Sequence, residues 1–146
     1  MFATATHPLN AYAKVGIETG VDGADPHALV MMLFDGALTA LADARFHIGQ
    51  KNIPGKGQSI SKAIMIIESG LKISLDIKAG GELAERLSAL YSYMCDRLLM
   101  ANLQNSVEII AEVAGLLSEL RGAWEGIKPA ANYDVTAVHL SANVRA

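Results

Sequence analysis

Side chains that could hold a metal or activate a nucleophile are few and scattered in this chain of 146 residues. Asp43 and His47 stand four residues apart, a spacing that places two side chains on one face of a helix. Two ligands are too few for a zinc site, so we interpret them as a surface Asp–His pair. Cys95 is the only cysteine, with Asp96 beside it and no histidine nearby, which does not favour a reactive thiolate. The sequence therefore predicts no metal site.

Motifs typical of enzymes are missing as well. None of the four histidines follows a glutamate by three residues, the arrangement that carboxylate-bridged di-iron bundles use. The segment Pro54–Gly57 resembles a phosphate-binding loop only superficially, because the spacing of that motif and the strand before it are absent. We predict no catalytic residues, no cofactor and no enzyme activity, so binding has to carry the function.

The composition describes one apolar domain. Charged residues make up 18% of the chain, where about 25% is usual, and the mean hydropathy is +0.28. A net charge of -3 argues against an electrostatic nucleic-acid binder. No apolar run approaches ~18 residues and the first ten residues lack the pattern of a signal peptide, so we expect a cytoplasmic protein without membrane insertion. A chain this apolar either buries nearly all of its apolar surface, forms an oligomer, or keeps an apolar surface for a partner.

Hydrophobic residues recur at helical spacing in four stretches that turn signals separate. Asp25 followed by Pro26 forms a strong helix start, and Asn105 followed by Ser106 forms a junction between two helices. Gly80 and Gly81 stop the second stretch. The expected helices are residues 25–49, about 57–78, 82–104 and 107–127.

These stretches predict an all-α fold. Short connections make consecutive helices antiparallel neighbours, so the expected architecture is an antiparallel four-helix bundle. We place the bundle in residues 25–128, after a mobile N-terminal arm of residues 1–24 and before a short C-terminal tail of residues 129–146.

The last three helices carry more apolar residues than a bundle helix needs, which is about three positions in seven. Two interpretations remain open: a groove for a client peptide, or broad faces that serve a wider core or a structural or regulatory homodimer. Methionines suit an adaptable surface, although a position in the core is the more frequent explanation for each. Candidate partner-binding residues are those that lie off the main apolar stripes: Ile66, Ile73, Ile77, Tyr93 and Met100.

The N-terminal arm adds a second candidate. Leu9, Tyr12 and Val15 approximate helical spacing in an otherwise small and polar segment. The arm either covers a groove until a partner binds or docks to complete the core.

Several segments, in order and with matching spacing, resemble the FliS family of flagellin-specific secretion chaperones over roughly residues 9–128. They are Ala11–Val15, Asp25–Ala37, Gly80–Glu82, Leu90–Met94, Arg97–Leu98, Ala101–Asn102, Glu112–Val113, Leu116–Leu117 and Ala123–Trp124. There are two departures: Asp25 replaces the more usual Ser or Thr cap, and Asp96 stands where members often carry a basic residue.

The resemblance implies a function as well as a fold. Members bind the disordered C-terminal region of flagellin in the cytoplasm, block its premature polymerisation and deliver it to the export gate of the flagellar type III secretion apparatus. The family's arm positions for flagellin binding fall on Leu9 and Tyr12, with Val15 nearby.

Overall fold

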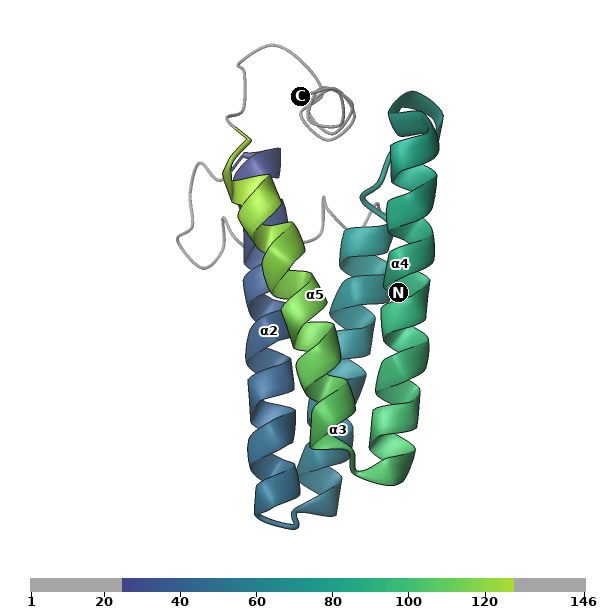
Figure 1. The fold of residues 1–146 in the computed structure, drawn as a ribbon. Coiled ribbons are helices and arrows are strands. Elements are labelled where there is room, and N and C mark those ends of the chain that lie inside the picture. Colours follow the sequence, from purple (N-terminus) through teal and green to yellow (C-terminus); the bar gives the residue numbers. More distant parts are fainter. Residues whose placement is uncertain (1–24, 128–146) are drawn as a thin grey trace, which may run out of the picture.

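The computed structural model describes residues 25–127, and in this part the chain forms helices and no strands (Figure 1). The elements are α2 (Pro26–Gly49), α3 (Ile53–Ile66), the π-helix η1 (Ile67–Lys72), α4 (Ile77–Gln104) and α5 (Val107–Glu125). Four α-helices run alternately up and down and pack side by side, which confirms the predicted all-α bundle. The predicted arm and tail, and with them Leu9, Tyr12 and Val15, lie outside the described residues.

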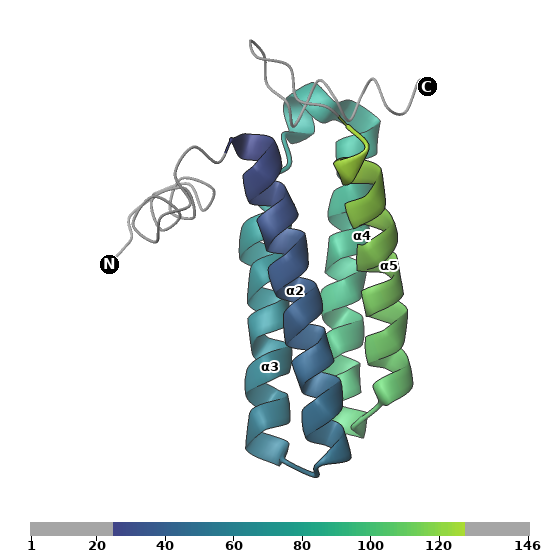
Figure 2. The same cartoon turned by 90° about the vertical axis from the view of Figure 1, so that its left-hand side faces the viewer.

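Among the four α-helices, the backbones of consecutive helices approach closely, and the bundle closes where α5 meets α2. On the diagonals, α2 with α4 and α3 with α5, no Cα atoms lie within 8 Å of one another, whereas η1 approaches α2. Figure 2 shows the two hairpins of this four-sided bundle side by side, α2 with α3 and α4 with α5. The α2–α3 loop and the α4–α5 junction therefore lie at the same end, the lower end in Figures 1 and 2.

Two predicted helix starts are confirmed by their capping geometry. The Asp25 carboxylate accepts a hydrogen bond from the Ala28 amide at 2.8 Å, and Pro26 occupies the first turn. Asn105 adopts the left-handed conformation with φ of 53°, after which the Ser106 hydroxyl accepts from the Ile109 amide at 3.1 Å. Both signals are local, so tertiary packing did not override them.

The second and third helices have different bounds from those predicted. Asn52 caps α3 by accepting from the Gly55 amide at 3.1 Å, so the Asn–Pro–Gly region starts a helix instead of separating two. Asp76 caps α4 in the same way through Ala79, at 3.0 Å. A first break therefore comes before Gly80 and Gly81, and a second lies at the predicted position, where Gly81 has a non-helical φ of 60° and ψ of -138° that separates a short first turn from the rest of α4.

Ile66 corrects one prediction about the surface. It is only 6% exposed and belongs to the core, whereas Ile64 of the predicted main stripe is half-buried. Its Cδ1 would lie 3.3 Å from a Cβ added to Gly36, so it packs against α2. Because α3 lies between α2 and α4, it buries a wider arc than one stripe.

A pair of aromatic side chains joins the first turn of α2 to the last turn of α5. The His27 and Trp124 rings stack with centroids 5.2 Å apart and an angle of 13° between their planes. His27 Nε2 donates to the Trp124 carbonyl at 2.7 Å, and Trp124 Nε1 donates to the His27 carbonyl at 3.0 Å. This His27–Trp124 clasp fixes the two ends of the described chain side by side.

Within residues 25–127, α2 alone is long and apolar enough by composition to cross a membrane. The central helix of a bundle meets the same criterion, and α2 supplies fully buried core residues such as Ala37, Leu41 and Ala44. We therefore assign its hydropathy to the core.

Candidate binding surface

The side chains of Cys95 and His47, which could take part in chemistry, make hydrogen bonds within the bundle instead. Cys95 is buried and its thiol donates to the Ile64 carbonyl, with 3.9 Å between Sγ and O. Burial, with a further contribution from Glu68, raises the pKa of this thiol to about 11, so it stays protonated at neutral pH. His47 Nδ1 accepts from the Asn52 side-chain amide at 3.3 Å. Among the described residues no three His, Cys, Asp or Glu side chains gather as a metal site would require.

Lys56 belongs to the segment Pro54–Gly57, which is helical in the structure and not a loop. It lies in the first turn of α3 and is only 6% exposed. Its ammonium donates to the Asn102 carbonyl at 2.9 Å and to the side-chain oxygen of Asn105. A cation at these last carbonyls also complements the dipole of α4. Lys56 thus holds the end of α4 against the start of α3.

A polar network crosses between α4 and α5 near their middle. The Tyr93 hydroxyl and Arg97 Nε donate to the two carboxylate oxygens of Glu112, the latter at 3.0 Å. These hydrogen bonds lower the pKa of Glu112, while the bond to the carboxylate raises the pKa of Tyr93. The ring of Tyr93 remains exposed beside this network. The network therefore joins α4 to α5 near their middle.

Beyond this network, α4 and α5 diverge towards the upper end of the bundle in Figure 1, where residues 25 and 127 lie. Leu90 lies seven residues before Arg97, and Leu116 lies one turn after Glu112, so helical spacing places both on the facing sides of the two helices. The residues that continue these rows are half-exposed leucines. We call this set the α4–α5 seam: Leu83, Leu87, Leu90, Leu116 and Leu120.

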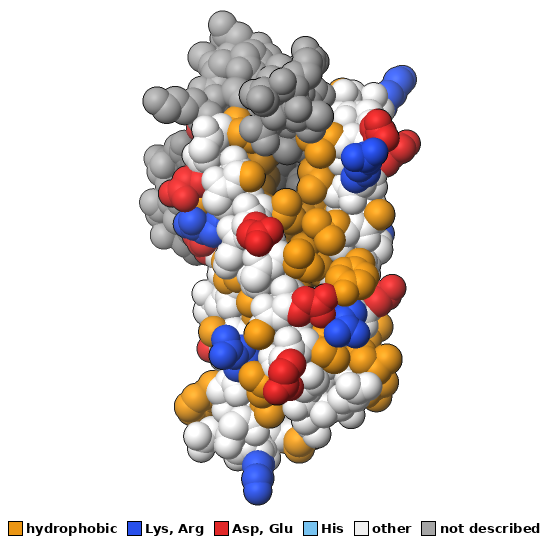
Figure 3. All heavy atoms as spheres, viewed as in Figure 1, with side chains coloured by type: hydrophobic (Ala, Val, Ile, Leu, Met, Phe, Trp, Pro, Cys, Tyr) orange, Lys and Arg blue, Asp and Glu red, His pale blue; other side chains and the backbone are white. Residues whose placement is uncertain are grey.

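The seam forms a continuous apolar band on the surface. In Figure 3, hydrophobic side chains gather along the line between α5 and α4, above the acidic and basic groups of the crossing. All five leucines are partly exposed, and all except Leu83 also pack against the core. A partner with apolar side chains can complete their burial, since each half-exposed leucine gains about 1 kcal/mol when fully covered.

The other predicted surface residues do not form one face. Ile73 and Ile77 are exposed on the connection between η1 and α4, and Tyr93 is exposed in the middle of α4. Met100 is exposed two turns further along, where its sulfur contacts the Gln104 amide. Four of the five candidates predicted on the helices are therefore exposed, and Ile66 is buried.

The seam leucines are the residues that sequence reasoning missed as a surface. Leu83, Leu87 and Leu90 recur at helical spacing along α4, a pattern that by itself indicates burial in the core. Their exposure follows from the divergence of α4 from α5, which no periodicity in the sequence reveals.

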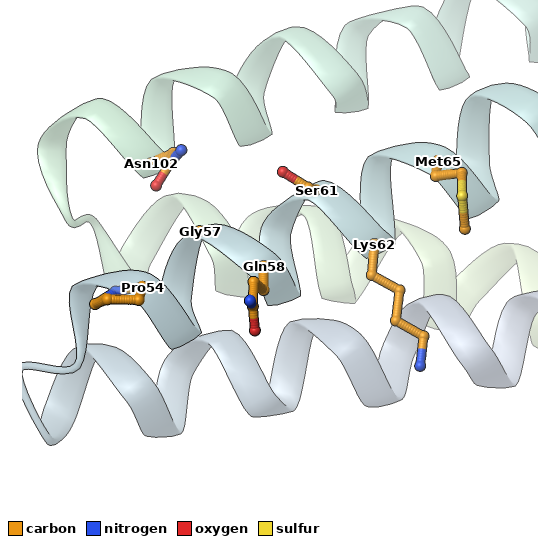
Figure 4. Close-up of a pocket in the computed structure, with 7 residues that line it drawn as sticks. All are labelled: Pro54, Gly57, Gln58, Ser61, Lys62, Met65 and Asn102. Atoms are coloured by element: carbon orange, nitrogen blue, oxygen red, sulfur yellow. The ribbon is translucent and has the colours of Figure 1, made fainter.

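A shallow depression of about 700 Å³ lies on a different side, between α3 and the end of α4 (Figure 4). Ser61 and Asn102 point towards one another across it, whereas Lys62 points away (Figure 4). The remaining lining is Pro54, Gly57, Gln58 and Met65, of which Met65 is the one large hydrophobic side chain. This depression lacks the apolar continuity of the α4–α5 seam.

A helical bundle with a half-exposed apolar seam is typical of protein-binding modules. Comparison with known proteins agrees with this class and identifies the family. Residues 8–131 match the family described as flagellar protein FliS. The chain belongs to this FliS family, whose curated members are flagellar secretion chaperones and not enzymes.

Relatives span distant bacteria. The flagellar secretion chaperone FliS of Salmonella typhimurium is 50% identical over 125 residues, which cover 86% of this chain and 93% of the relative. FliSB of Pseudomonas aeruginosa is 44% identical, with 84% of this chain and 97% of the relative covered. FliS of Bacillus subtilis is 30% identical, with 82% and 84% covered. The helical core described above lies entirely within the matched family region.

Proposed function

We propose that this chain binds the disordered C-terminal region of flagellin in the cytoplasm, prevents its premature polymerisation and aids its delivery to the flagellar type III export apparatus. Export-gate components are its second class of partner. The observation that supports the proposal is the half-exposed α4–α5 seam in a chain that belongs to a family of flagellar secretion chaperones.

The chemistry of such a client suits the seam. A segment that forms amphipathic helices in a filament has an apolar face to cover while it is unassembled. Burying ~1,000 Å² of apolar surface corresponds to about 25 kcal/mol by area. Ordering the client and losing its translational freedom offset most of this gain. The modest remainder lets a chaperone hold its client and release it without ATP.

The arm residues Leu9, Tyr12 and Val15, with the exposed side chains of Ile73, Ile77, Tyr93 and Met100, complete the proposed set of client contacts. Replacing Leu9 and Tyr12 by alanine is expected to weaken client binding and to leave thermal unfolding nearly unchanged. A collapse of the melting temperature would instead assign the arm to the core.

Calorimetry with a flagellin C-terminal peptide tests the proposal directly. We expect binding near one to one with a negative heat-capacity change, because apolar surface is buried. Leu83→Ser and Leu120→Ser in the seam should each weaken binding about tenfold. Leu103→Ser, at the other end of α4, is the matched control and should bind as the unmodified chain does. Equal affinity of all three variants removes the seam from the client site.

Sedimentation separates this function from that of a structural homodimer. A client chaperone should form a one-to-one complex with the peptide. A tight dimer that persists without client and that the peptide does not dissociate would support the homodimer and contradict the proposal.

A further inference from the structure

The hairpin end formed by α2 and α3 has an unusual charge distribution. Residues 44–67 include Arg45, Lys51, Lys56 and Lys62 but none of the 15 acidic residues of the chain. Lys56 is committed to the end of α4, whereas Arg45, Lys51 and Lys62 make no ion pair among residues 25–127. Three free cations therefore lie at one end of a chain whose net charge is -3.

The same end carries the most exposed hydrophobic side chains. Among the large hydrophobic residues of the described chain, the four most exposed are Phe46, Ile53, Leu99 and Leu103, with 54% to 79% of their surface accessible. They belong to the last turn of α2, the first turn of α3 and the last two turns of α4. In antiparallel helices these turns meet at one end, and the Lys56 hydrogen bonds join two of them directly. We call this set, with Arg45, Lys51 and Lys62, the basic end.

Figure 3 agrees with this distribution. The lowest part of that face carries hydrophobic and basic side chains, while acidic side chains lie higher on the bundle. Asp43 on α2 and Glu68 in η1 border residues 44–67, and Asp96 and Glu108 border the end of α4 in the sequence. Among the described residues, Arg45, Lys51 and Lys62 form an ion pair with none of them.

The geometry favours a flat partner over a peptide. The apolar side chains come from three different helix ends around a convex tip, whereas a peptide needs a continuous groove. The depression nearest to them is shallow, and Met65 is the one large hydrophobic side chain that lines it. A lipid surface accepts separate protruding side chains at its acyl boundary and places its phosphates beside the cations.

We propose that the basic end docks this protein onto an anionic membrane surface. Phe46, Ile53 and Leu103 enter the headgroup layer, and Arg45, Lys51 and Lys62 contact lipid phosphates. The acidic remainder of the chain is repelled, which orients the bundle axis away from the bilayer. The α4–α5 seam then points away from the membrane and remains free for a client.

Vesicle co-sedimentation of the full chain tests this inference without any client. Vesicles of phosphatidylglycerol and phosphatidylcholine should bind the protein at low salt, and vesicles of phosphatidylcholine alone should not. Each cation near such a surface contributes about a fivefold change in partition. Lys51→Glu should therefore reduce binding by at least fivefold, and added salt should weaken it further.

Matched variants separate a defined docking end from general attraction. Phe46→Ser should reduce vesicle binding, while Met32→Ser, at an exposed site near the other end of α2, should not. Arg86→Glu is the corresponding control for Lys51→Glu, because Arg86 is exposed near the opposite end of α4. Equal binding to neutral and anionic vesicles would overturn the proposal, and so would equal losses of binding in the variants and their controls. The proposal would also be overturned if this end bound an acidic peptide but did not bind vesicles.

Discussion

Replacing Lys56 by methionine isolates the contribution of one buried ammonium group. Methionine keeps most of the aliphatic length but leaves the Asn102 carbonyl and the Asn105 side-chain oxygen without their donor. Hydrogen bonds from a charged donor contribute about 2 kcal/mol net, so this variant should be less stable by that amount. Lys56→Ala also removes three buried methylene groups at ~0.8 kcal/mol each, which brings its expected loss to about 4 kcal/mol.

Urea unfolding followed by circular dichroism measures both losses, provided that the slope of free energy against urea is unchanged. The methionine variant should melt about 8 °C lower, at ~4 °C per kcal/mol for a domain of this size. Lys62→Met, an exposed lysine two turns along the same helix, should remain within about 0.5 kcal/mol of the unmodified chain. A Lys56→Met protein as stable as the original would refute the reasoning, because desolvation of the ammonium would then cancel its hydrogen bonds.

Three further predictions concern single side chains. Gly81→Ala should cost about 1–3 kcal/mol because its φ of 60° and ψ of -138° suit only glycine, whereas Gly115→Ala, in open space on α5, should stabilise the helix in the same urea assay. Trp124→Phe keeps the stacked ring but removes the donor to the His27 carbonyl, and thermal unfolding should show a loss of about 1 kcal/mol. Cys95 should react with a disulfide reagent at pH 8 only as fast as the protein unfolds; rapid modification of the native state contradicts its burial. Because folding raises the pKa of this thiol from 9.0 to about 11, its protonated form supports the native state below pH 9, and that support is lost between pH 9 and 11.

Local signals in the sequence predicted the fold well. Asp25 and the Asn105–Ser106 pair cap their helices as expected, because capping depends on residues within one turn. Gly80 and Gly81 were correct as the boundary before the third helix, because the backbone at Gly81 is non-helical, but the second helix ends earlier and Asp76 caps an additional short turn before them. The boundary depends on both the Asp76 cap and the nearby glycine pair, and the sequence alone does not show which of the two starts the helix.

The surface was harder to predict because it depends on neighbouring helices. Ile66 looked peripheral on a single helix, yet α2 covers it. Lys56 looked solvated, yet the end of α4 supplies its acceptors from 46 positions away in the chain. Leu83 looked internal, yet the divergence of α4 and α5 leaves it half-exposed. Tyr93 was identified correctly as an exposed residue, although nothing in its own helix predicted the Glu112 partner.

The His27–Trp124 clasp also determines how the bundle responds to mechanical load. Tension applied through residues 25 and 127 enters the molecule at one end, across two adjacent antiparallel helices. Such a load peels α2 from α5 one turn at a time, beginning with the stacked rings, instead of shearing all their contacts together. A machine that pulls on this chain by its extremities therefore needs only a small force sustained over a long distance.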